Sequence, residues 1–110
     1  MEHKILGFTA AIANGHNPRD YSFEEKDIPI GDFEAYLDFM VWSKNQVAIN
    51  CYFTTKEGVK IQLTAFRDKI TRKYVAGDYN FYDASIGIKM MLTTKHNSKK
   101  NLKFINAKLL

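Results

Sequence analysis

The sequence predicts an all-β protein, a small closed or nearly closed antiparallel barrel with an extra N-terminal strand. Apolar and polar residues alternate with a period of two over most of the chain, which is the pattern of half-buried strands. Turn-forming residues separate the alternating segments, and helical patterns are marginal. The 110 residues are enough for one domain with its own core. The composition, 45% apolar and 25% charged, argues against general disorder.

The strongest local pattern is a β-hairpin between Val47 and Arg67. Two alternating runs flank a turn in which Gly58 is expected in the left-handed conformation, leaving a three-residue loop. Because the period is two, each set of side chains lies on its own face, and the turn fixes the register. The expected pairs on the apolar face are Phe53 with Ile61, Cys51 with Leu63 and Ile49 with Ala65. On the other face Tyr52 pairs with Gln62, and Ala48 with Phe66.

Further strands are expected at 4–13, 33–43, 85–94 and 101–109. The segment 33–43 also fits a helical period, so an α+β protein with residues 33–43 helical is the alternative. Aromatic and β-branched residues are dense in this segment, and the strand is preferred for that reason. Residues 19–32 are acidic and read as a mostly irregular, solvated loop. Gly87 inside 85–94 indicates a bulge or a sharp bend.

Three consecutive strands, a short helical or irregular segment and two more strands form the element order of this chain. That order resembles the oligonucleotide-binding (OB) barrel, with 4–13 as an added strand. A second mapping takes 4–13 as the first barrel strand. The resemblance implies a ligand groove on the second and third strands and on the loops after the first and fourth.

Charge is distributed unevenly along the chain. Residues 1–55 carry a net charge of −4 and residues 56–110 a net charge of +8. This asymmetry indicates an anionic partner for the second half. The alternative is that the lysines only solvate loops and strand edges.

Several classes of protein are disfavoured. No apolar run reaches the length of a membrane span, and no signal peptide is recognisable, so an intracellular, cytoplasmic protein without membrane contact is expected. The single cysteine, Cys51, lies on the apolar face and is expected to be an inert buried thiol. His3, His16 and His96 are scattered, and no phosphate-binding loop or nucleophile motif occurs. The sequence therefore predicts no enzyme, no cofactor and no metal site.

Single-stranded nucleic acid binding, DNA favoured, is the predicted function, with low sequence specificity. It requires aromatic faces for base stacking, interleaved with cations and amides. The central hairpin and its flanking loops carry these residue types. The candidate binding residues are Trp42, Lys44, Asn50, Tyr52, Lys60, Gln62, Phe66, Lys95, Lys99 and Lys100.

Two alternatives remain open at this point. Tyr52 and Phe66 could be covered by the N-terminal strand or by residues 14–32, and Trp42 could be partly buried packing. A protein–protein interaction module, including a small viral or mobile-element protein acting on a host protein, would also suit an aromatic-rich face. The acidic segment 20–38 opposite the basic half would permit a homo-oligomer.

Overall fold

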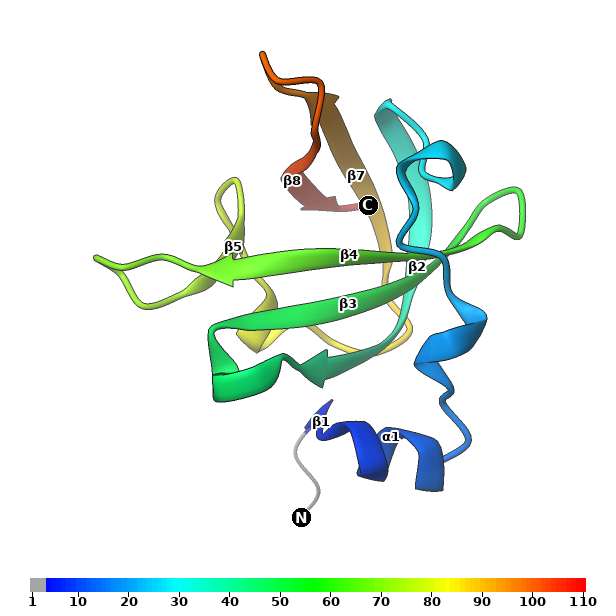
Figure 1. The fold of residues 1–110 in the computed structure, drawn as a ribbon. Coiled ribbons are helices and arrows are strands. Elements are labelled where there is room, and N and C mark those ends of the chain that lie inside the picture. Colours follow the sequence, from blue (N-terminus) through cyan, green and yellow to red (C-terminus); the bar gives the residue numbers. More distant parts are fainter. Residues whose placement is uncertain (1–3) are drawn as a thin grey trace.

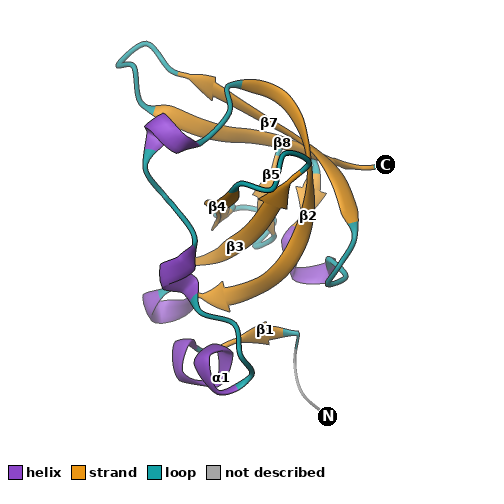
Figure 2. Ribbon diagram, turned by 90° about the vertical axis from the view of Figure 1, so that its right-hand side faces the viewer, coloured by secondary structure: helices purple, strands orange, loops and turns teal. Residues whose placement is uncertain are grey.

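The computed structural model describes residues 4–110, so His3 lies outside the described residues. One sheet runs in the order β6-β5-β4-β3-β2-β7-β8, with β1 beside β2, and curls into a nearly closed barrel (Figures 1 and 2). The strands are β1 Ile5–Leu6, β2 Gly31–Trp42, β3 Ala48–Thr55, β4 Lys60–Arg67, β5 Tyr74–Ala76, β6 Tyr79–Asn80, β7 Lys89–His96 and β8 Leu102–Leu109. The helices are α1 Phe8–Ala13 and the 3-10 turns η1 Pro18–Asp20, η2 Glu25–Asp27, η3 Lys44–Gln46 and η4 Phe81–Asp83. Within residues 4–110, no helix has the length and apolar character needed to cross a membrane.

The long strand β2 makes the barrel possible. Its first half, residues 31–36, pairs with β7, and its second half, from Ala35 to Trp42, pairs with β3. The two halves of β2 therefore pair mainly with different strands. The strand bends between them, and Figure 2 shows that curvature. The predicted strand at 33–43 is confirmed, and the helical alternative for this segment is wrong.

The central hairpin has the predicted register throughout. Phe53 pairs with Ile61, Cys51 with Leu63 and Ile49 with Ala65. Gly58 has a φ of +87°, and its N–H donates to the carbonyl of Thr55 at 2.8 Å. The turn therefore uses the left-handed glycine that its sequence requires. Cys51 is fully buried, and this burial raises the pKa of its thiol, as expected of an unreactive cysteine.

The predicted strand at 4–13 is largely wrong. Only Ile5 and Leu6 form a strand, parallel to β2, and helix α1 follows at Phe8–Ala13. Three alanines in this segment favour a helix, and packing decides the outcome because Ala11 is fully buried against the sheet. The extra N-terminal strand of the predicted barrel thus exists as β1 alone.

The strand predicted at 85–94 begins later, at Lys89. Gly87 adopts a φ of +87° and bends the chain before β7, which leaves Ile86 exposed. Met90 and Leu92 point into the core as expected. The strand predicted at 101–109 is confirmed as β8.

Two bulges change which residues face the core. The pairing of β2 with β3 shifts between Leu37 and Phe39, so Asp38 is an extra residue. Leu37 therefore faces the inner core, whereas Phe39 and Val41 face outward and form a second cluster. Strict alternation along 33–43 predicts all three on one face, and this prediction is wrong beyond Leu37. In β8 the pairing shifts at Ile105 in the same way.

Candidate functional site

The barrel is open along one seam, between β4 and β8. In the described part of the chain, β8 pairs with β7 alone, and β4 pairs with β3, with β5 near its end, and with Ser22 near its start. Ser22 donates to the carbonyl of Lys60 at 3.0 Å and accepts from the N–H of Gln62 at 2.8 Å. We call residues 22–28 the strap, because they lie along β4 and also reach β8.

The strap and the β5–β6 turn frame the two ends of this seam. At one end the carboxylate of Glu25 accepts a hydrogen bond from the N–H of Leu102 at 2.5 Å. At the other end Gly77 lies so close to β8 that a Cβ there would be 2.3 Å from Oδ1 of Asn106 and 2.9 Å from the carbonyl oxygen of Ile105. The seam is thus held at its ends and open between them.

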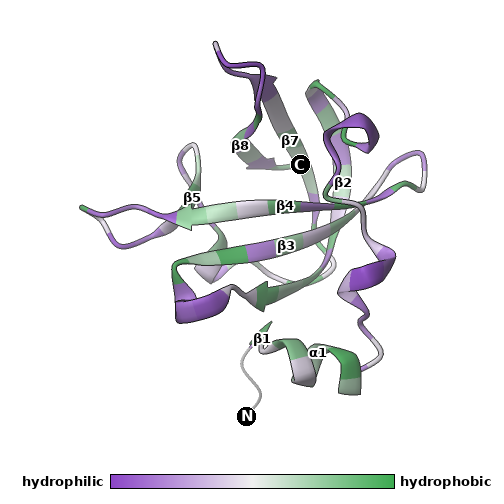
Figure 3. Ribbon diagram, in the orientation of Figure 1, coloured by the Kyte–Doolittle hydropathy of each residue, from purple (hydrophilic) through white to green (hydrophobic). Residues whose placement is uncertain are grey.

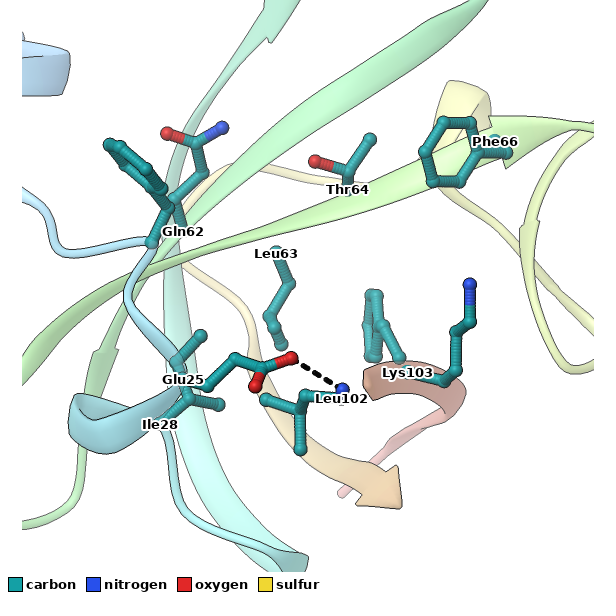
Figure 4. A pocket seen from close by; sticks show the side chains of 10 residues that line it. Glu25, Ile28, Gln62, Leu63, Thr64, Phe66, Leu102 and Lys103 are labelled. Atoms are coloured by element: carbon teal, nitrogen blue, oxygen red, sulfur yellow. Dashed lines mark hydrogen bonds between the residues drawn. The ribbon is translucent and has the colours of Figure 1, made fainter. Parts of the chain in front are cut away.

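A pocket of about 380 Å³ occupies the open part of the seam, and we call it the groove. Figure 4 shows Gln62, Thr64 and Phe66 in a row on one side and Leu102 and Lys103 on the other. The strap contributes Phe23, Glu25 and Ile28, β4 contributes residues 62–64 and 66, and β8 contributes residues 102–104. Ile28 and Leu63 are buried at its base, whereas Phe23 is 73% and Phe66 65% exposed. Such exposure leaves the two aromatic rings free to contact a ligand.

One of the residues that line the groove is a cation, Lys103, and further lysines are exposed on other elements. Lys103 lines both the groove and a neighbouring hollow of about 230 Å³, which Lys95 also lines. Lys99 and Lys100 are exposed in the turn between β7 and β8. Lys60, also exposed, holds its Nζ 5.5 Å from the centre of the Tyr21 ring at the strap end. Lys103 is therefore the lysine at the groove itself, and the others are exposed on other elements.

The acids of the strap are engaged within the protein. Glu25 binds the backbone of β8, as described above. Glu24 pairs with Lys26 at 3.3 Å, and the carboxylate of Asp27 accepts a hydrogen bond from the hydroxyl of Ser22 at 2.6 Å. Of these three carboxylates, Glu25 alone lines the groove.

Tyr52, one of the predicted binding residues, is buried. Its side chain is only 3% exposed, because Phe39 and Tyr21 pack against it on the outer face of the sheet. Its ring lies edge-on to Tyr21 at 5.3 Å, and burial raises the pKa of Tyr52 to about 12. The N-terminal region covers this part of the hairpin, which was one of the two alternatives for this face.

Trp42 and Lys44 also lie away from the groove. The bulge at Asp38 turns Trp42 toward the inner core, where its ring contacts Tyr74 edge-on at 5.3 Å. Lys44 is exposed in η3, the turn that joins β2 to β3, and does not line the groove. Asn50 is half-buried and accepts a hydrogen bond from the hydroxyl of Thr64 at 3.0 Å.

Of the predicted set, Gln62 and Phe66 line the groove, and Lys95 lines the second hollow. The predicted lysines Lys60, Lys99 and Lys100 are exposed but line neither. Sequence reasoning missed Phe23, Lys103 and Phe104. Phe23 was a recognisable signal, an isolated aromatic residue within a run of acids. No local pattern shows that β8 and the strap meet at β4, because that contact depends on the closure of the barrel.

Comparisons of the chain with protein-family models, with curated proteins and with solved structures found no match. Among residues 4–110, no three His, Cys, Asp or Glu side chains gather in a way that could hold a metal ion. The assignment of a function consequently depends on the chemistry of the groove and its surroundings.

Proposed function

We propose that the protein binds single-stranded nucleic acid, with DNA favoured, in the groove between β4 and β8 and with low sequence specificity. The observation that supports this proposal is the pair of exposed rings, Phe23 and Phe66, on an open groove that Lys103 also lines. Two exposed rings on one groove form an aromatic surface, and nucleobases are flat partners for such rings.

Each part of the groove has a role in this proposal. Bases stack on the phenylalanine rings, a contact worth about 1–3 kcal/mol per base that tolerates every base because each has a π-face. The amide of Gln62 offers donors and an acceptor to base edges or sugars, and the hydroxyl of Thr64, which donates to Asn50, offers an acceptor. Lys103 and the lysines of the β7–β8 turn neutralise phosphates. Low sequence specificity follows, since stacking and charge supply most of the binding energy.

A fluorescence anisotropy titration tests the proposal. A labelled dT15 oligonucleotide is titrated with the wild-type protein and with Phe66→Ala at low salt, and rU15 is titrated in parallel. Loss of one stacked base should weaken binding roughly 5- to 150-fold. The fold should survive, because 65% of the Phe66 side chain is exposed.

The matched control is Phe8→Ala. Phe8 is a half-exposed phenylalanine on α1, and it does not line the groove. Its replacement should leave the dissociation constant for dT15 unchanged. Equal weakening by both variants would show that the groove is not the binding surface. The relative affinities for dT15 and rU15 decide whether DNA is the preferred ligand.

A further inference from the structure

The loop between β4 and β5 carries the most exposed apolar side chain that the described residues contain. Ile70 is 91% exposed at the tip of this loop, residues 68–73. Figure 1 shows the loop projecting from the barrel, and Figure 3 shows a hydrophobic tip on a hydrophilic loop. An aliphatic side chain held this far from the core makes little contact within the protein and is accessible to another molecule.

The loop is ordered by its own hydrogen bonds. Oδ1 of Asp68 accepts from the backbone N–H groups of Ile70 and Thr71, both at 2.9 Å. The N–H of Asp68 donates to the carbonyl of Lys73 at 2.8 Å, and the N–H of Arg72 donates to the carbonyl of Asp68 at 2.9 Å. Ile70 is therefore presented on a preorganised turn, which lowers the entropic cost of binding through it.

The surroundings of Ile70 are strongly basic. Four exposed cations, Arg67, Lys69, Arg72 and Lys73, flank it within a few residues. The single acid in the loop, Asp68, uses its carboxylate for the internal hydrogen bonds, and those bonds lower its pKa. A partner suited to this loop offers negative charges with apolar surface between them, and a nucleic acid does so with stacked bases between its phosphates.

The loop also continues the line of the groove. Phe66 stands on the rim of the groove, one residue before Arg67 at the end of β4, and the loop follows directly. A strand that runs along β4 past Gln62 and Phe66 would arrive at Ile70 next. If the nucleic acid becomes double-stranded just beyond the groove, the end of the duplex would meet Ile70.

We propose that the β4–β5 loop recognises the boundary between a single strand and a duplex, with Ile70 packed on the last base pair. This inference rests on the function proposed above. Insertion of an aliphatic side chain into an intact duplex separates two stacked base pairs. The free-energy cost of this unstacking is about as large as the free energy gained by burying one isoleucine. At a duplex end the stack is already interrupted, so burial of Ile70 is a net gain there. The flanking cations contact the phosphates of both strands.

Three labelled ligands test this inference at one salt concentration: dT15, a hairpin duplex with a 15-nucleotide single-stranded tail, and the same hairpin without a tail. Tails of both polarities are used, because the direction of the strand along β4 is open. The wild-type protein should bind the tailed hairpin of one polarity about tenfold more tightly than dT15. Ile70→Ala should remove this preference while leaving the affinity for dT15 within about twofold.

Val59→Ala is the matched control, because Val59 is an exposed β-branched residue at the other end of β4. It should retain the preference for the tailed hairpin. Equal affinity of the wild-type protein for dT15 and both tailed hairpins would overturn this inference and leave the proposed function standing. No binding to any oligonucleotide at low salt would overturn both. Binding to vesicles of phosphatidylserine and phosphatidylcholine that Ile70→Ala abolishes would assign the loop to a membrane surface instead, and would overturn the inference.

Discussion

Phe39 and Tyr52 are cross-strand neighbours whose rings stack with centroids 4.4 Å apart and planes 7° from parallel. His16 stacks on Phe39 in turn, at 4.7 Å, and Tyr21 contacts both rings edge-on at 5.3 Å. The outer face of β2 and β3 is therefore a second core layer under the N-terminal region. This packing makes the rings of Phe39 and Tyr52 inaccessible to a ligand, whereas Phe23 and Phe66 are exposed at the seam between β4 and β8.

Tyr52→Ala should destabilise the protein by about 3–5 kcal/mol, because it removes a buried aromatic ring from a packed cluster. Tyr52→Phe keeps the ring and should change the free energy of unfolding by less than about 1 kcal/mol at pH 7. Urea denaturation measures both values. Tyr36→Ala, at an exposed tyrosine of β2, is the control and should cost less than about 1 kcal/mol. A stable Tyr52→Ala protein would contradict the described packing.

Alkaline pH should weaken the fold through the buried phenols. Burial raises the pKa of Tyr52 to about 12, and burial, followed by the hydrogen bond to Asp38, raises the pKa of Tyr21. A raised pKa means that the folded state holds the proton more tightly, so this contribution is complete below pH 10 and is lost as the pH rises toward 12. Melting temperatures measured from pH 9 to 11.5 should fall, and they should fall less steeply for Tyr52→Phe. Identical slopes for the two proteins would count against a buried phenol at this position.

Gly77→Ala should be clearly destabilising, by roughly 2–4 kcal/mol. Gly77 has a φ of +63°, and an added Cβ would collide with Asn106 and with the backbone of β8. Gly15→Ala measures the conformational cost of a non-glycine residue at positive φ without a steric clash. Gly15 has a φ of +82° and open space around its Cβ position. It should cost about 1 kcal/mol, measured by the same urea titration. Equal losses for the two variants would mean that the β5–β6 turn does not close the seam as described.

Glu25→Gln should strengthen oligonucleotide binding at low salt by roughly two- to fivefold, because it removes a negative charge from the groove. The amide oxygen of glutamine is still able to accept the hydrogen bond from Leu102. Glu24→Gln makes the same change in net charge one residue away, outside the set of groove-lining residues. Anisotropy titrations with dT15 should show a smaller effect for Glu24→Gln. Weaker binding by Glu25→Gln would contradict the placement of phosphates near this carboxylate.

The parts of the fold that follow from local patterns were predictable. The hairpin register follows from the turn at Gly58 and from the alternation on both sides of it, and β2 follows from its density of aromatic and β-branched residues. These signals agree with one another over short distances along the chain. The OB-like order of strands followed from the lengths of the segments and their spacing.

The remaining features depend on contacts that are remote in sequence. Asp38 forms a bulge where its carboxylate accepts hydrogen bonds from Tyr21 and Thr54, and this bulge reverses the sidedness of Phe39 and Trp42. The helical conformation of 8–13 is stabilised by burial of Ala11 on a sheet formed later in the chain. The groove itself requires that the strap cross from β4 to β8. The alternation of residues carries no information on the bulge, the packed helix or the strap. For this reason Tyr52 and Trp42 were wrongly expected on the ligand-binding face, and Phe23 was missed.

The salt dependence of dT15 binding tests the central claim most directly. Roughly three to five of the lysines around the groove are expected to contact phosphates, so a plot of log Kobs against log[NaCl] should have a slope of roughly −2 to −3.5. The titration is run from 25 to 300 mM NaCl, values chosen to span roughly one decade in salt. Tight binding at low salt with this slope is the predicted result. Absence of binding at the lowest salt concentration, or an affinity that does not change with salt, would contradict the account.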